Sequence, residues 1–138
     1  AALLLQDQPE AFMLVAPSDH LICDLEAFYA ALHTARAASQ DHGALVTFGI
    51  TPDQPETGYG YLGLSEAPKT ATALRLSSFH EKPNLARAEE MLAAGTYLWN
   101  AAMAIWGSPV WGRPMTSAGP SLSTMRSWKK PTKSWLCR

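Results

Sequence analysis

The first residues that could carry chemistry lie directly after an apolar run near the start of the chain. This run ends in Pro17-Ser18-Asp19-His20. A carboxylate is a hard oxygen ligand of the kind that Mg²⁺ prefers, so Asp19 is a candidate metal ligand. Asp19 could equally cap a turn or a helix. His20 is better explained as a structural or surface imidazole.

A turn rich in glycine and tyrosine lies in the middle of the chain, at Glu56-Thr57-Gly58-Tyr59-Gly60-Tyr61. Gly58 and Gly60 have no side chain, which allows the backbone to approach a ligand closely. The ring of Tyr59 offers a flat face suited to a sugar or a base. An ordinary hairpin turn with core tyrosines would give the same pattern, so this turn alone does not establish a site.

A third group of polar residues follows the end of a predicted strand, at Glu81-Lys82-Pro83. Neighbouring residues of a strand face opposite sides, so Glu81 could accept hydrogen bonds from sugar hydroxyls while Lys82 meets a phosphate. An exposed pair of charges is the alternative. Asn100 could bind a hydroxyl or serve a turn, and the turn is slightly favoured.

Hydrophobic patterning predicts the elements that position these residues. The apolar run 12–16 is typical of a strand buried on both faces, with Asp19 beyond its carboxyl end, where ligands bind in open α/β sheets. Asp24 is a favourable N-cap for a helix that ends at Gly43. The β-branched and aromatic residues of 44–50 predict a second buried strand. This order predicts a βαβ unit with a right-handed crossover.

The rest of the ordered pattern predicts two strands, 61–64 and 73–79, followed by a helix and a further strand. In the second strand the residues alternate, which predicts one partly solvated face. Asn84 is the expected N-cap of the helix and Gly95 its end. Residues 101–106 are the last predicted strand, and residues 1–6 read as the final turns of an earlier helix.

Composition divides the chain in two. Residues 1–106 hold all twelve acidic residues and five of the eleven basic ones, whereas 107–138 holds six basic residues and no acid. The tail combines these basic residues with prolines, serines and isolated tryptophans, so we expect it to be poorly ordered; a basic, aromatic RNA-binding arm is the sharper alternative. We therefore expect one domain over 1–106 and an irregular tail over 107–138.

The overall formal charge of -1 favours neither a nucleic-acid binder nor a membrane-surface protein. Apolar runs fall short of the roughly 20 residues needed to span a bilayer. Cys23 and Cys137 lack the paired spacing of a zinc or redox site, so a cytoplasmic protein is the expectation. A homo-oligomer is compatible with these features, which leave the oligomeric state open.

The order and spacing of these motifs closely resemble bacterial mannose-1-phosphate guanylyltransferases, a group of hexose-1-phosphate nucleotidyltransferases. The resemblance covers residues 1 to 106 and rests on five stretches: Pro17-Ser18-Asp19-His20, Val46-Thr47-Phe48-Gly49-Ile50, Pro55-Glu56-Thr57-Gly58-Tyr59-Gly60-Tyr61, Phe79-His80-Glu81-Lys82-Pro83 and Tyr97-Leu98-Trp99-Asn100. It implies an α/β fold that is part of a Rossmann-like nucleotide-diphospho-sugar transferase domain, with a mixed sheet flanked by helices.

The resemblance also implies substrates and roles. The family joins mannose 1-phosphate and GTP to give GDP-mannose and pyrophosphate. Asp19 would hold Mg²⁺ near the nucleotide phosphates, and Asp19 and Lys82 would be the catalytic pair. Substrate binding would fall to one set of residues: Gly58, Tyr59, Gly60, Glu81, Lys82 and Asn100.

Two departures from the family pattern qualify these expectations. The family's glycine-rich, basic triphosphate loop is not found before Ala1, so we expect little or no turnover by these 138 residues alone. Where the family has Asn-Ser-Gly or Asn-Ala-Gly, this chain has Asn100-Ala101-Ala102. The alternatives are a nucleotidyltransferase for another hexose 1-phosphate, a non-catalytic remnant that binds a sugar nucleotide or a protein partner, and a truncated product without a biological role.

Overall fold

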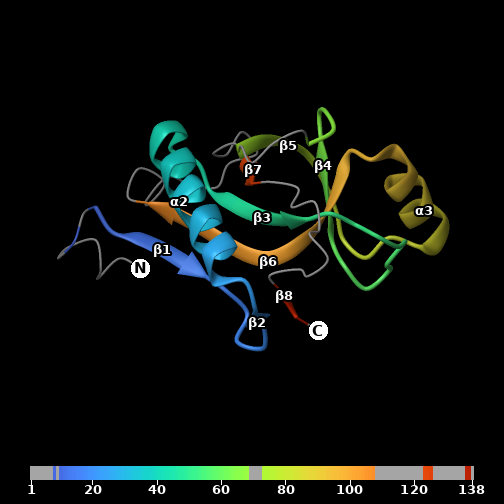
Figure 1. Cartoon of the computed structure of the whole chain (residues 1–138). Coiled ribbons are helices and arrows are strands. Elements are labelled where there is room, and N and C mark those ends of the chain that lie inside the picture. Colours follow the sequence, from blue (N-terminus) through green and yellow to red (C-terminus); the bar gives the residue numbers. More distant parts are fainter. Residues whose placement is uncertain (1–7, 9, 69–72, 108–122, 126–135, 138) are drawn as a thin grey trace.

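A computed structural model gives the conformation of residues 8, 10–68, 73–107, 123–125 and 136–137, the last two segments for the backbone only. Figure 1 shows the arrangement of its helices and strands. In chain order the elements are β1 (Phe12–Val15), β2 (Leu21–Ile22), α2 (Leu25–His42), β3 (Val46–Ile50), β4 (Tyr61–Leu64), β5 (Ala73–His80), α3 (Leu85–Ala94), β6 (Tyr97–Gly107), β7 (Ser123–Met125) and β8 (Leu136–Cys137).

Both helices begin and end at the residues that the sequence predicts. The Asp24 side chain accepts a hydrogen bond from the Ala27 backbone N–H at 2.9 Å, and α2 ends at Gly43, whose φ is 55°. Asn84 caps α3 through the Arg87 N–H at 3.0 Å. A polar N-cap satisfies one of the free amides of the first turn, and the left-handed C-cap favours glycine.

The strands form a mixed sheet in the order β1-β6-β3-β7-β5-β4, in which β4 also pairs with β6. Both β1 and β3 run antiparallel to β6, which lies between them. The strands β1 and β3 are therefore parallel to each other, as the βαβ prediction requires, but they are separated by one strand. Their carboxyl ends lie at the same edge of the sheet, and the segments 16–20 and 51–60 follow these ends.

The prediction that the first strand is buried on both faces is wrong. Within the described residues β1 pairs only with β6, and it lies at the end of the strand order. Leu14 and Val15 are 41% and 47% exposed. One face is covered, since the Arg36 guanidinium of α2 lies 5.0 Å from the centre of the Phe12 ring. By contrast β3 is buried along nearly its whole length, as predicted.

Two hydrophobic clusters hold the helices against the sheet. In the first, Phe28 and Ala35 of α2 pack on residues of β3 and β6, including Phe48 and Met103. In the second, Ala88 and Met91 of α3 pack against the buried rings of Tyr61 and Trp99. Figure 1 shows α2 lying across β1, β3 and β6, with α3 at the other end of the molecule. The mixed sheet flanked by helices is confirmed.

The longest strand, β6, changes its neighbours at an irregularity near its middle. Thr47 pairs with Ala104, whereas Gly49 pairs with Asn100, so β6 has two extra residues at this point. Ala102 lies inside this bulge and adopts a φ of 53°. Bulges bend a strand and raise its twist, which lets β6 pair with β4 before the bulge and with β1 after it.

Several predictions concern residues that the structure does not describe. The predicted helix over 1–6 and most of the tail 107–138 lie outside the described residues. The described tail segments are β7, which pairs with β3 and β5, and β8, which pairs with β2. In the part of the chain that the structure describes, no helix is long and apolar enough to cross a membrane.

Candidate functional site

The glycine and tyrosine turn meets two of the other candidate stretches through backbone hydrogen bonds. The Lys82 N–H donates to the carbonyl oxygen of Tyr59 at 3.2 Å. The Asn100 N–H donates to the carbonyl oxygen of Gly60 at 2.8 Å. The turn, the end of β5 and the start of β6 therefore form one continuous structure, which we call the turn site: residues 56–61, 79–83 and 97–100.

Within the turn site, the backbone of the turn lies closest to neighbouring side chains at Gly60. A Cβ atom added there would lie 2.8 Å from Phe79 Cζ and 2.9 Å from Glu81 Oε2. Real Cβ atoms essentially never approach other heavy atoms so closely, so glycine is required for the present position of the Glu81 carboxylate. Gly58 is different, because a Cβ there would be 3.5 Å from the nearest atom, Glu56 Oε1.

Glu81 and Lys82 do not face opposite sides of a strand as predicted. The strand β5 ends at His80, and Lys82 has a φ of 44° in the turn that follows. The alternation of a strand does not apply there, and Lys82 Nζ lies 3.6 Å from Glu81 Oε1. The Lys82 side chain is 66% exposed and the Glu81 side chain is 57% exposed. Exposed ion pairs are weak, so both groups are accessible to a ligand.

The Asn100 side chain hydrogen-bonds to the bulge of β6 through its oxygen. Its Oδ1 accepts a hydrogen bond from the Ala102 N–H at 3.1 Å and lies 3.2 Å from Thr47 Oγ1. The Thr47 hydroxyl also donates to the Met103 carbonyl oxygen at 2.9 Å. Because an N–H donor fixes which side-chain atom is the oxygen, the Asn100 Nδ2 group points elsewhere, and it has no acceptor among the described residues.

Aromatic rings form the inner wall of the turn site. The rings of Tyr59 and Trp99 meet edge to face, with centroids 5.2 Å apart. Trp99 is 8% exposed, and its Nε1 has no hydrogen-bond partner within the described residues. Tyr61 is fully buried, and its hydroxyl donates to the Glu56 carbonyl oxygen at 2.8 Å. These contacts anchor the turn on the sheet.

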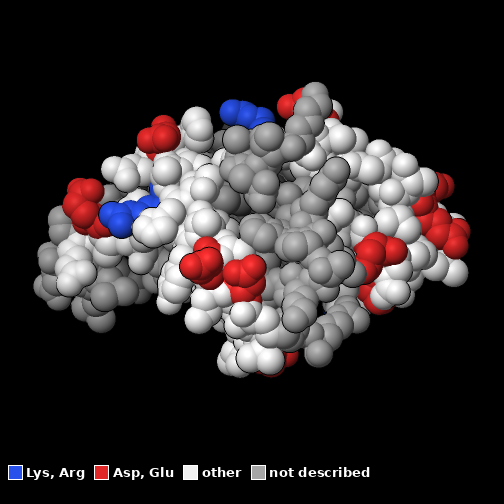
Figure 2. All heavy atoms as spheres, in the orientation of Figure 1, with Lys and Arg blue, Asp and Glu red and all other residues white. Residues whose placement is uncertain are grey.

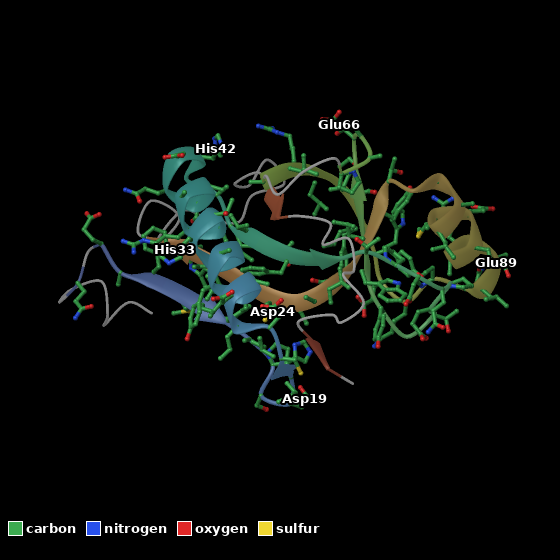
Figure 3. All side chains as sticks on the ribbon, viewed as in Figure 1. Asp19, Asp24, His33, His42, Glu66 and Glu89 are labelled. Carbon is green, nitrogen blue, oxygen red and sulfur yellow. The ribbon has the colours of Figure 1, made fainter. Side chains whose placement is uncertain are left out.

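Among the described residues, no hydrogen bond or ion pair joins Asp19 to the turn site. Figure 3 shows Asp19 beside β2, in the turn after β1, and away from α3, which carries Glu89. Its side chain is exposed, and no group of three or more metal-binding side chains occurs among the described residues. The neighbouring His20 is half-buried, and its Nδ1 has no partner in the described part of the chain.

Charges on the described surface do not form a single concentrated patch on the face that Figure 2 shows, where acidic groups occur at several separate places. Outside the turn site, Arg87 and Glu90 of α3 form an ion pair of 2.6 Å. The hydrogen bond with Glu90 raises the pKa of the Arg87 guanidinium above its ordinary value. This pair stabilises the surface of the helix and does not bear on the site.

Comparisons with known proteins identify the family of the chain. A family model described as nucleotidyl transferase matches residues 1–108. The chain belongs to the nucleotidyl transferase family. The region of this match contains every residue of the turn site and Asp19, and it stops where the composition of the chain changes.

Named relatives in the nucleotidyl transferase family confirm the resemblance to mannose-1-phosphate guanylyltransferases. The chain is 49% identical over 94 residues to the xanthan biosynthesis protein XanB of Xanthomonas campestris pv. campestris. The matched region covers 68% of this chain and 19% of XanB. The chain is 43% identical over 99 residues to a mannose-1-phosphate guanylyltransferase of Escherichia coli, with 70% and 20% covered. It thus spans about a fifth of the length of these relatives.

A solved structure supports the fold of this nucleotidyl transferase. The crystal structure of a mannose-1-phosphate geranyltransferase from Thermus thermophilus superposes with a TM-score of 0.66 at 34% identity. The superposition covers 78% of this chain and 30% of the Thermus chain. The partial nucleotide-diphospho-sugar transferase fold is therefore confirmed.

Sequence reasoning missed three side chains that shape the site. Thr47, 53 positions away in the sequence, lies with its hydroxyl 3.2 Å from Asn100 Oδ1. Phe79 lies against Gly60, and the Glu56 carboxylate binds backbone amides of the turn. The pattern of residues gave no signal for Thr47 or Phe79, because their partners are set by strand pairing. A carboxylate two residues before a glycine was the available signal for Glu56.

Proposed function

We propose that this chain is the sugar-recognition part of a mannose-1-phosphate guanylyltransferase, which forms GDP-mannose and pyrophosphate from GTP and mannose 1-phosphate. The relatives at 43% to 49% identity support this reaction, since one of them is named for it. We propose that GTP and mannose 1-phosphate are the substrates and that the site lies on the turn 56–61 and the residues that contact it.

One observation carries this proposal. The Glu81 carboxylate lies directly against the backbone of Gly60, where an added Cβ would be 2.9 Å from its Oε2, while Glu81 and Lys82 stay exposed. A carboxylate accepts hydrogen bonds from two neighbouring hydroxyls, as a sugar presents them, and an ammonium one residue away pairs with a phosphate. A sugar 1-phosphate carries both kinds of group.

The roles of the residues follow from their chemistry. Glu81 accepts hydrogen bonds from mannose hydroxyls, and Asn100 donates through its Nδ2. Gly58, Tyr59 and Gly60 border the sugar, and Lys82 neutralises charge on its phosphate. An oxygen of that phosphate attacks the α-phosphorus of GTP in line, and pyrophosphate leaves. Such transfer is catalysed mainly by positioning and charge stabilisation, without a covalent enzyme intermediate.

We propose Mg²⁺ as the cofactor, with Asp19 as its protein ligand. Mg²⁺ is commonly held by one or two carboxylates and completed by substrate phosphates and water. The exposed carboxylate of Asp19 fits that role. When bound, the ion would neutralise charge on the nucleotide phosphates, and Asp19 and Lys82 would then supply the charged groups of the reaction.

Glu81→Ala tests the sugar-recognition proposal directly. We expect the affinity for mannose 1-phosphate, measured by titration calorimetry on the 138-residue chain, to fall about 10-fold to 100-fold, since hydrogen bonds to a charged group contribute roughly 1.5–3 kcal/mol. Glu89→Ala removes an exposed carboxylate of α3 and should leave the affinity unchanged. Equal affinity of wild type and Glu81→Ala would refute the assignment.

Competition separates mannose 1-phosphate from other hexose 1-phosphates. Glucose 1-phosphate differs in the orientation of one hydroxyl, so we expect it to compete weakly for the same site. A GDP-mannose assay with GTP and Mg²⁺ tests the expected low turnover of these 138 residues. Robust product formation would contradict that expectation while supporting the proposed reaction.

A further inference from the structure

The carboxylate of Glu56 lies at the start of the turn site and hydrogen-bonds to the backbone of the turn. Its Oε1 accepts hydrogen bonds from the Thr57 N–H at 3.1 Å and the Gly58 N–H at 3.2 Å. Its Oε2 accepts from Gln54 Nε2 at 3.3 Å. The half-buried Glu56 side chain therefore hydrogen-bonds to residues on both sides of it within the first half of the turn.

The backbone of Glu56 is held as firmly as its side chain. The Tyr61 hydroxyl donates to its carbonyl oxygen at 2.8 Å, and its own N–H donates to the Gln54 carbonyl oxygen at 3.0 Å. Tyr61 is fully buried within β4, so this hydrogen bond ties the turn to a rigid strand. Glu56 thereby links the sheet to the amides at the tip of the turn.

The second half of the turn meets the other two stretches of the site. The carbonyl oxygens of Tyr59 and Gly60 accept from the amides of Lys82 and Asn100. The amides that Glu56 binds, at Thr57 and Gly58, directly precede Tyr59 and Gly60 in the chain. Loss of its carboxylate would leave the Thr57 and Gly58 amides without their present acceptor.

We propose that Glu56 is a positioning residue of the sugar site, which holds the turn 57–60 in the conformation that presents Glu81 and Lys82 to a hexose 1-phosphate. Binding energy depends on such preorganisation, because a turn that must be ordered on binding lowers the affinity. This inference rests on the proposed function for the identity of the ligand, but the anchoring of the turn can be measured without any ligand.

The test compares wild type, Glu56→Ala and Glu56→Gln. Amide hydrogen exchange measured by NMR on the 138-residue chain should become about tenfold faster or more at Thr57 and Gly58 in Glu56→Ala, as expected for loss of hydrogen bonds to a charged acceptor. Glu56→Gln keeps an oxygen acceptor and should restore most of the protection. The Phe48 amide in β3 should exchange at the same rate in all three proteins.

Titration with mannose 1-phosphate then completes the test. We expect the dissociation constant to rise about tenfold in Glu56→Ala and to recover to within about threefold of wild type in Glu56→Gln. Glu89→Ala, which removes the same charge from α3, should change neither measurement. Gln rescue distinguishes a specific hydrogen-bonding role from a general loss of charge.

Two results would overturn parts of this inference, and a third would overturn the proposed function while leaving the anchoring of the turn. Unchanged exchange at Thr57 and Gly58 in Glu56→Ala would refute the anchoring of the turn. Faster exchange with an unchanged dissociation constant would refute the positioning role. If wild type fails to bind mannose 1-phosphate while exchange is faster in Glu56→Ala, the proposed function is wrong and the anchoring of the turn still holds.

Discussion

Ala102 adopts a left-handed backbone conformation, with a φ of 53°, at the centre of the bulge in β6. For residues other than glycine this conformation costs roughly 1–2 kcal/mol, because the Cβ atom crowds the following carbonyl oxygen. Asn100 Oδ1 accepts the Ala102 N–H and so helps to hold the strained residue in place. The resemblance stated from the sequence implies glycine at this position, and the left-handed backbone gives a physical reason for it.

Ala102→Gly should therefore stabilise the protein. The strain that is relieved exceeds the extra chain entropy of glycine in the unfolded state, and we expect a net gain of about 0.5–1 kcal/mol. Urea denaturation followed by circular dichroism measures it. As a matched control, Ala37→Gly in the exposed middle of α2 should cost about 1 kcal/mol. Destabilisation by both substitutions would contradict the assigned strain.

The two ends of the Asn100 side-chain amide differ in their contacts. The slightly favoured interpretation of Asn100 as a turn residue describes its carbonyl oxygen, which serves the bulge. Its Nδ2 group takes no part in that hydrogen bond, so a structural role for one end of an amide is compatible with a binding role for the other.

Among the elements, β6 determines the layout of the site. It pairs with β3, β4 and β1, contributes Trp99 and Asn100 to the turn site, and contributes Met103 to the core under α2. This multiple pairing requires close packing across the sheet. Gly49 of β3 allows it, since a Cβ there would lie 2.6 Å from Leu98 Cδ1 and 2.9 Å from Leu98 Cβ.

Gly49→Ala should destabilise the protein by about 1–3 kcal/mol, the usual cost of overpacking a core. Leu98 is 1% exposed, so its Cβ cannot move without a shift of the β6 backbone. Gly58→Ala is a matched control, because the nearest atom to its added Cβ is 3.5 Å away. We expect its unfolding free energy to stay within about 0.5 kcal/mol of wild type by urea denaturation. A Gly49→Ala protein as stable as wild type would show that β3 and β6 can separate.

At the scale of the whole molecule, two hydrophobic clusters lie under two helices and are connected through β6. The α2 cluster includes Met103, and the α3 cluster includes Met91 and Trp99. Because one strand takes part in both, we expect the described domain to unfold as a single cooperative unit.

Met103→Ala and Met91→Ala test this expectation together. Each methionine is 1% exposed, so each substitution should cost about 2–5 kcal/mol. We expect each variant to show one transition that tryptophan fluorescence and circular dichroism report at the same urea concentration. Leu85→Ala, at a residue 55% exposed, should cost less than about 1 kcal/mol. Separate transitions for the two probes would show that the clusters unfold independently.

Much of the local structure was predictable from the sequence because short-range physics determines it. Asp24 and Asn84 cap helices through backbone amides three residues away, and Gly43 and Gly95 end them with left-handed backbones. The alternation along β5 followed from the pleat of a strand, and the burial of β3 followed from its continuous apolar run. The resemblance to a family added the identity of the candidate site.

Tertiary structure alone decided the placement of the candidate residues. Strand pairing brought the turn 56–61 against Glu81 and Asn100, whereas Asp19 lies in a separate turn beside β2, without a hydrogen bond to them among the described residues. The exposure of β1 depended on its place at the end of the strand order, which its apolar run cannot reveal. Spacing along a chain determines helix caps and strand faces, but the partners of a strand depend on contacts between residues far apart in sequence.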